Sequence, residues 1–251
     1  VAGQSPRVLL DPNTWSTDGA TALAEWKPSR DGKYVAYTVQ DGGTDWRTIH
    51  VVETATGRVL DDTLDWAKFT HLAWDRASQG FFYSRHPASR KGKDFVSAVY
   101  DHQVHYHRIG TPQSADRLIF RTPEHLNYYN EASATADGRW LVIRSSRGSD
   151  DNYEITVVDL AKPDWTPRTL IPGLTNDYKL AGGRGDTLYF VTNNGAPRYR
   201  VVGIDATRTG APCLLDQGRA FGHDGREHGR AGPGLVDADH DRPTRHKGGD
   251  Q

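Results

Sequence analysis

The chain has 251 residues, enough for one large all-β domain or two ordinary domains with a sizeable core. Its 31 basic and 32 acidic residues give a formal net charge of -1, which excludes a whole-protein field that would attract nucleic acid or an anionic membrane. Cys213 is the only cysteine, which excludes intrachain disulfides and cysteine-based zinc sites. No apolar run approaches the roughly 18 residues that span a bilayer. We therefore expect a soluble chain, in either the cytoplasm or the periplasm.

The first predicted element is an antiparallel hairpin. In Lys33–Val39 and Trp46–Val52, aromatic and β-branched residues recur at the strand period, which predicts strands with one buried face. The Asp-Gly-Gly between them supplies the positive φ angles that hairpin turns need. A strand at Ala22–Trp26 precedes the hairpin and a strand at Arg58–Leu60 follows it. The four segments together predict a small antiparallel sheet.

The same order of strand, turn and strand returns three times, at Phe69–Ser84, Glu131–Ser145 and Tyr178–Thr192. The turn glycines that mark the repeat are Gly32, Gly80, Gly138 and Gly185. They stand 48, 58 and 47 residues apart. Repeats of roughly 40 to 50 residues with about four short strands are typical of propeller blades. The predicted fold is therefore all-β, a partial β-propeller of about four blades with four antiparallel strands each, and the longest interval holds a blade loop at Pro87–Val99.

The composition changes near the C-terminus. The fourth unit loses its outer strand over Ala211–Gly218, and from Cys213 onward the chain is rich in Gly, Arg, Asp and His without an apolar period. We divide the chain into an N-terminal lead-in segment (1–21), a partial propeller domain (22–212) and a tail (213–251). The tail is predicted to be disordered or translated out of frame. Together with the absence of methionine, this predicts a truncated, frameshifted or processed fragment.

Three stretches carry a family resemblance: Leu-Asp-Pro-Asn at Leu10–Asn13, Gly-Thr-Asp-Trp at Gly43–Trp46, and Lys-Phe-x-x-x-Ala-Trp at Lys68–Trp74, followed by Phe-x-Tyr. Over roughly Val8–Asp205 the chain resembles the N-terminal part of the propeller of the prolyl oligopeptidases, serine peptidases that cleave short peptides after proline. Its wealth of Ala, Arg, Asp and Gly also resembles bacterial sequences.

The resemblance implies a larger enzyme. Members carry a seven-bladed propeller that gates and size-selects substrates, and an α/β-hydrolase domain with a Ser, Asp, His triad for acyl transfer. This chain contains no Gly-x-Ser-x-Gly nucleophile elbow. We therefore assign no catalytic residue, metal or cofactor, and predict that the chain alone is inactive. The expected partners are short proline-containing peptides and the α/β-hydrolase domain of the same parent chain, with neither nucleic acid nor membrane among them.

The resemblance also implies two substrate-lining residues. Phe69 matches a family phenylalanine that helps to line the substrate pocket, and Tyr129 falls near another apolar lining position. The alternative is that both are core aromatics of their blades. Asp45 and Trp46 offer a further choice: a site, or a turn in which Asp45 accepts amide hydrogen bonds while Trp46 packs between sheets.

Histidines raise a metal hypothesis. His102, His105 and His107 lie close together, and the last two would share one face of a strand. The favoured interpretation is a solvated hairpin face. The tail holds His223, His228, His240 and His246, for which weak metal binding and plain disorder are the alternatives.

A second function class stays open beside the peptidase fragment. The chain could be a stand-alone propeller-like module for protein interaction or binding. Cooperative folding as a stable monomer would favour this class, because a partial propeller exposes sheet faces that promote aggregation.

Overall fold

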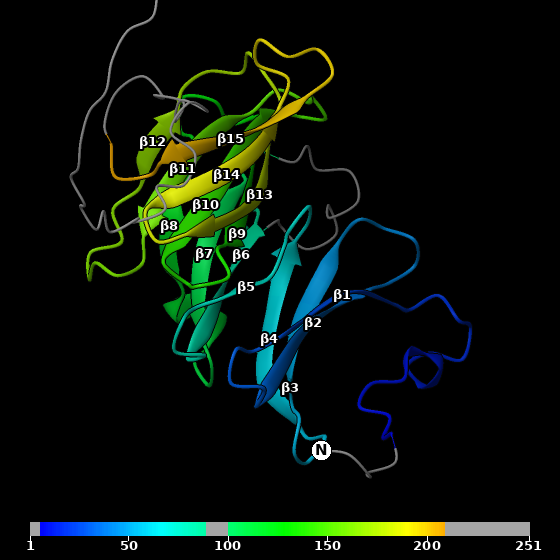
Figure 1. Ribbon diagram of the computed structural model, residues 1–251. Helices are drawn as coiled ribbons and strands as arrows, with labels where there is room; N and C mark the ends of the chain where they lie inside the picture. Colours follow the sequence, from blue (N-terminus) through cyan, green and yellow to red (C-terminus); the bar gives the residue numbers. More distant parts are fainter. Residues whose placement is uncertain (1–5, 89–99, 209–251) are drawn as a thin grey trace, which may run out of the picture. The chain divides into compact units, whose positions relative to one another are not determined.

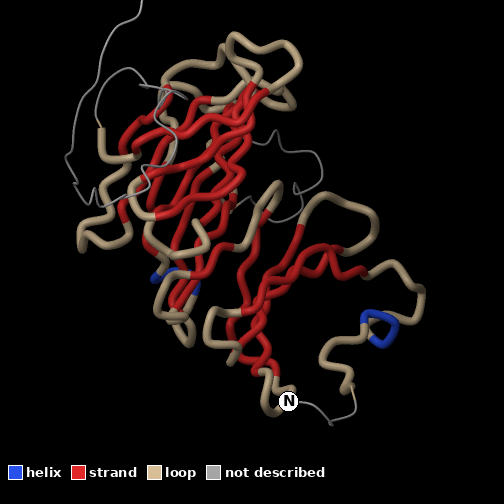
Figure 2. Tube along the Cα trace, in the orientation of Figure 1, coloured by secondary structure: helices blue, strands red, loops and turns tan. Residues whose placement is uncertain are grey.

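The computed structural model describes residues 6–88 and 100–208. These residues fold almost entirely as strands and connecting loops (Figure 2). Two short 3-10 helices accompany the strands, η1 (Pro12–Thr14) and η2 (Gln113–Ala115). In the part of the chain so described, no helix is long and apolar enough to cross a membrane. Most of the predicted blade loop, the strand lost over 211–218 and the whole tail lie outside the described residues.

The first four strands form an antiparallel meander, as the hairpin and its flanking segments predict. They are β1 (Ala22–Pro28), β2 (Tyr34–Gln40), β3 (Arg47–Glu53) and β4 (Val59–Ala67). The central hairpin pairs Tyr34 with Glu53 and Gln40 with Arg47, so the turn at 41–46 closes it without a slip in register.

Three more groups of strands repeat this order (Figure 1). The second comprises β5 (Ala73–Trp74), β6 (Gly80–Arg85), β7 (Gln103–Arg108) and β8 (Arg117–Phe120). The third comprises β9 (Tyr128–Ala134), β10 (Trp140–Arg147), β11 (Glu154–Asp159) and β12 (Arg168–Ile171). The fourth contributes β13 (Tyr178–Arg184), β14 (Thr187–Thr192) and β15 (Arg200–Asp205). The all-β prediction with four blade-like groups is confirmed. The first two groups are joined, because Ala67 of β4 pairs with Arg85 of β6.

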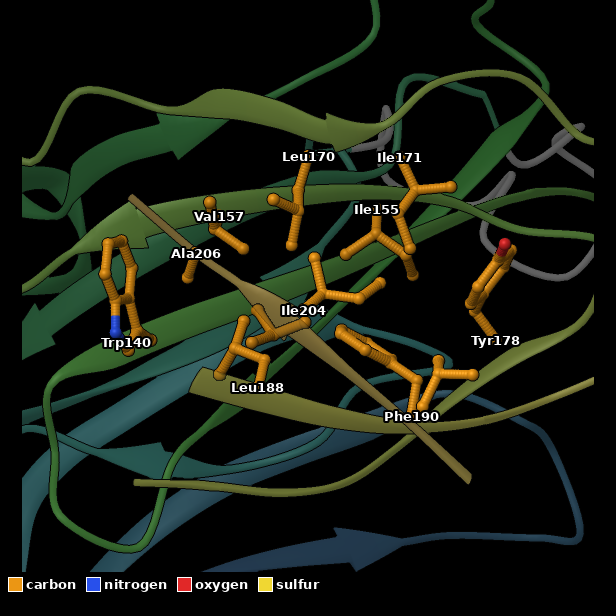
Figure 3. Packing of buried hydrophobic residues seen from close by; sticks show 12 residues of the cluster. Trp140, Ile155, Val157, Leu170, Ile171, Tyr178, Leu188, Phe190, Ile204 and Ala206 are labelled. Atoms are coloured by element: carbon orange, nitrogen blue, oxygen red, sulfur yellow. The ribbon is translucent and has the colours of Figure 1, made fainter. Parts of the chain in front are cut away.

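The sheets pack face to face, and alternate residues of one strand serve different neighbours. In β10, Leu141 and Ile143 pack in a core shared with the second group, whereas Trp140 and Val142 pack in a core shared with the fourth. Figure 3 shows the latter core, with Trp140 and Ile155 of the third group facing Leu188 of the fourth. The expectation of one buried face per strand was wrong, because a sheet between two neighbours buries both faces and its strands become continuous apolar runs.

Turns at one end of the strands also link the groups. The backbone N–H of Asp31 donates to Ser78 Oγ at 3.2 Å, 47 residues away. The N–H of Gly185 donates to Asp137 Oδ2 at 3.0 Å, 48 residues away. The indole N–H of Trp140 donates to the Gly185 carbonyl at 2.8 Å. The sequence repeat is thus the spacing at which equivalent turns meet.

The two outermost sheet faces differ. On the first sheet, Tyr37 and its buried neighbours pack against Leu9, Leu10 and Trp15 from the segment that precedes β1. On the fourth sheet, Tyr189 and Val201 are 41% and 54% exposed. The first sheet is therefore covered on its outer side by the chain itself.

Replacing Leu141 with Ala tests the stacking. Leu141 is fully buried, so the cavity and lost burial are expected to lower the free energy of unfolding by about 2 to 5 kcal/mol. Leu118→Ala, at a position 45% exposed, is the control and should change it by less than about 0.5 kcal/mol. Urea unfolding measures both; equal losses would contradict the packing described.

Candidate functional site

Phe69 lies in the short connection between β4 and β5, in a strained conformation. Its φ is 50°, in the left-handed region that bulky residues rarely adopt. The next residue holds the connection in place, because Thr70 Oγ1 accepts a hydrogen bond from the Ser84 amide at 2.7 Å. The Phe69 side chain is half-buried.

Tyr129 stands at the beginning of β9, in the third group of strands, opposite Ser146 of β10. Its ring and that of Phe69 are 4.8 Å apart at their centroids and tilted by 49°, a favourable arrangement for an aromatic pair. Tyr129 is also half-buried. The structure therefore brings together the two residues that the sequence singled out, as an aromatic pair between two blades.

Lys68 connects this pair to the hairpin of the first blade. Its Nζ lies 5.1 Å from the Phe69 ring centroid and 5.4 Å from that of Trp46, within the range of cation–π attraction. The same ammonium forms an ion pair with Asp45 at 3.3 Å. Trp46 packs edge-on against Trp66 of β4, with centroids 6.0 Å apart. Trp46 thus contacts Trp66 of the neighbouring strand and His86, which follows β6.

Two neutral imidazoles lie beside the aromatic residues. The ring centroids of His86 and His102 lie 4.6 Å apart, with the two rings tilted by 31°, and each ring lies edge-on to Tyr129. Burial, followed by the nearby His86, lowers the pKa of His102 to about 3. His102 Nδ1 accepts the Asn130 amide at 2.9 Å, so its Nε2 carries the proton that bonds the Lys68 carbonyl at 2.8 Å. These bonds fix the backbone on both sides of the Phe69–Tyr129 pair.

The other histidines of this stretch are also buried, and the expectation of a solvated hairpin face was wrong. His107 is held between two buried carboxylates, with Nδ1 2.7 Å from Asp116 and Nε2 2.8 Å from Asp62. Burial alone would lower the pKa of His107, but its hydrogen bonds to Asp116 and Asp62 outweigh burial and raise it to about 9. His107 is thus an internal cation that ties together strands β4 and β7 and the residue before β8.

His105 bonds a different partner, Gln103, with His105 Nε2 2.9 Å from the Gln103 Oε1 atom. Within residues 6–88 and 100–208, no group of three or more His, Cys, Asp or Glu side chains is arranged to hold a metal ion. His102, His105 and His107 each hydrogen-bond a different partner, namely Lys68, Gln103 and Asp116. The four tail histidines lie outside the described range.

Sequence reasoning missed three residues around the aromatic pair: Trp66, Lys68 and His86. Trp66 and His86 both contact Trp46, and Lys68 lies over two rings. The available signal was the density of aromatic and basic residues in Trp66–Phe69. This density did not indicate to which face of the sheet the side chains point. The φ of Trp66 is 64° and reverses the usual alternation of side chains along a strand.

Comparison with known proteins shows to which family the chain belongs. The family model described as "Prolyl oligopeptidase, N-terminal beta-propeller domain" matches residues 1–212. The chain belongs to the prolyl oligopeptidase family. The prolyl endopeptidase of Elizabethkingia meningoseptica is 35% identical over 202 residues, covering 80% of this chain and 28% of that protein. Prolyl oligopeptidase A of Amanita bisporigera is 31% identical over 220 residues, covering 78% and 28%.

Solved structures give the same relationship. A prolyl endopeptidase from a study of inter-domain dynamics is 41% identical with a TM-score of 0.75, and the match covers 84% of this chain and 29% of that chain. Apo prolyl oligopeptidase B from Galerina marginata is 28% identical with a TM-score of 0.71, covering 81% and 30%. The chain thus spans less than a third of the length of these relatives and matches their N-terminal propeller portion.

The buried histidines predict how stability depends on pH. The pKa of His102 is about 3 in the folded chain, against an ordinary 6.5, so stability is expected to fall as pH drops below about 6.5. The pKa of His107 is about 9, against the same 6.5. Its stabilisation is complete below about 6.5 and is lost as pH rises through about 9.

Urea unfolding from pH 5 to pH 10 measures both limbs of this profile. His107→Gln should flatten the alkaline limb and leave the acid limb, whereas His102→Gln should do the reverse, so each variant is the control for the other. An unchanged alkaline limb in His107→Gln would contradict the assignment of the internal cation.

Proposed function

We propose that this chain is the substrate-gating propeller portion of a prolyl oligopeptidase-type serine endopeptidase, and that Phe69 and Tyr129 form part of its proline-peptide pocket. The observation that carries the proposal is the pairing of these two rings, 4.8 Å apart, in a chain of this family. Both rings are half-buried rather than enclosed in the core. A peptide can therefore contact them.

The aromatic pair suits proline for a physical reason. Proline has no backbone N–H, so its residue is recognised mainly through the shape and apolar surface of its ring. Aromatic side chains supply large apolar faces of fixed orientation. Burial lowers the pKa of both neighbouring imidazoles, His86 and His102, so they are uncharged near neutral pH. The Lys68 ammonium, 5.1 Å from the Phe69 ring centroid, is paired with Asp45.

The chemistry of cleavage belongs to the catalytic domain that such enzymes carry. The 251 residues contain no Gly-x-Ser-x-Gly segment, and we assign no nucleophile, base or oxyanion donor to them. The stacked sheets would then limit which peptides reach a neighbouring hydrolase domain. This role agrees with the solved complex of the Galerina marginata relative with a 25mer macrocyclization substrate.

Peptide binding tests the pocket. The blocked peptide acetyl-Gly-Gly-Pro-Gly-amide is expected to bind the purified chain more tightly than its Pro-to-Ala analogue. Phe69→Ala and Tyr129→Ala should each weaken proline-peptide binding about five- to tenfold, since each removes an apolar contact. NMR titration measures the Kd values. Trp26→Ala, at a position 60% exposed on β1, is the matched control; equal Kd values for both peptides would refute the pocket.

A hydrolysis assay tests whether this chain cleaves peptides without a catalytic domain. We expect no turnover of a fluorogenic proline peptide by the purified chain, because it offers no activated serine. Reproducible cleavage that a serine-directed inhibitor blocks would overturn this expectation. A stable, cooperatively folding monomer without any preference for proline would instead favour the stand-alone binding module.

A further inference from the structure

A pocket lies at the hairpin end of the first sheet, and Lys68 connects it with the aromatic pair. Its volume is about 290 Å³. The walls come from the end of β2, the following turn, the start of β3 and the end of β4, and include Asp41, Thr44, Trp46, Arg47, Asp65 and Trp66. We call it the Trp46–Trp66 pocket. The two indoles stand nearly perpendicular, at 86°, and so form adjoining aromatic walls.

The Trp66 wall is set by an irregularity in the sheet. Between the pairs Arg47–Ala67 and Ile49–Leu64, β4 contains one residue more than β3, a bulge of the kind that redirects a side chain. Within it, Trp66 has a φ of 64°. Such strain in a non-glycine residue persists only where the surroundings enforce it, and it concentrates at functional sites.

The surroundings do enforce the bulge. The side-chain amide of Gln113, from the second blade, donates to the Asp65 carbonyl at 3.0 Å and accepts from the Asp65 N–H at 3.2 Å. One side chain therefore clamps both backbone groups of the residue before Trp66. The pocket is held rigidly even though its carboxylates are exposed.

The charges of the lining favour a cation. Asp41 and Asp65 supply two carboxylates, and the single guanidinium of the lining, Arg47, lies 3.9 Å from Glu25. The nearby ammonium of Lys68 is paired with Asp45 at 3.3 Å. Indole faces attract cations, and carboxylates at the rim add to this attraction.

We propose that the Trp46–Trp66 pocket binds a cationic group of a peptide, either a lysine or arginine side chain or a free amino terminus. This proposal rests on the proposed function in one respect: it takes the proline of the peptide to lie at the Phe69–Tyr129 pair. Lys68 Nζ lies 5.4 Å from the Trp46 ring and 5.1 Å from the Phe69 ring. The rings are therefore at most about 10.5 Å apart, roughly three residues of extended peptide.

The pocket thus selects substrates that carry a positive charge up to three residues from the proline. NMR titration of the full chain, followed on the tryptophan indole N–H signals, tests this. The probe is acetyl-Lys-Gly-Gly-Pro-Gly-amide, compared with the analogue that carries uncharged norleucine in place of lysine. The lysine peptide is expected to bind at least about fivefold more tightly. A second comparison uses Gly-Gly-Gly-Pro-Gly-amide with a free or an acetylated amino terminus, and distinguishes the two sources of the cation.

Variants locate the effect. Trp66→Ala and Asp65→Asn should abolish the preference for lysine over norleucine, while Trp66→Phe should retain it and so exclude collapse of the fold as the cause. Trp26→Ala and Asp61→Asn are the controls, since they alter an exposed tryptophan and an exposed carboxylate elsewhere on the same sheet. They should leave the preference unchanged.

Three outcomes would overturn the proposal: equal Kd values for the lysine and norleucine peptides, tighter binding of norleucine, or a lysine preference that survives Trp66→Ala. Repeating both titrations with alanine in place of proline separates this proposal from the proposed function. A lysine preference that persists without any proline preference removes only the proline pocket. A proline preference without a lysine preference removes only the cation pocket.

Discussion

The structure depends on the packing of one sheet face against the next. A small antiparallel sheet with two apolar faces cannot be stable alone in water, because each face must be removed from solvent by a neighbour. The third group of strands meets this constraint on both sides, with Leu141 in one core and Trp140 in the other. The charged group His107 lies in this interior between two partners, Asp62 and Asp116.

The same constraint determines where binding chemistry can lie. Side chains in the middle of the strands are needed for packing between sheets. Residues that bind other molecules therefore lie mainly in connections and at strand ends. Trp66 and Phe69 both lie there, at the end of β4 and just beyond it, and both have positive φ angles. The Phe69–Tyr129 pair and the Trp46–Trp66 pocket therefore depend on one short, strained connection, with Lys68 between them.

The sequence predicted the elements whose causes are local. Asp-Gly turns and alternating side chains identified the hairpins, and the spacing of turn glycines identified the repeat. Phe69 and Tyr129 came from the family resemblance alone, because no local pattern joins residues of different blades. The burial of His107 was missed since its partner Asp62 is 45 residues away, and the direction of Trp66 was missed because a bulge is a property of two paired strands.

The two outer faces give the stack a direction. Leu9, Leu10 and Trp15 seal the first sheet, whereas Tyr189 and Val201 leave apolar surface open on the fourth. The face that carries Tyr189 and Val201 is therefore the side of the stack on which a further sheet would be buried.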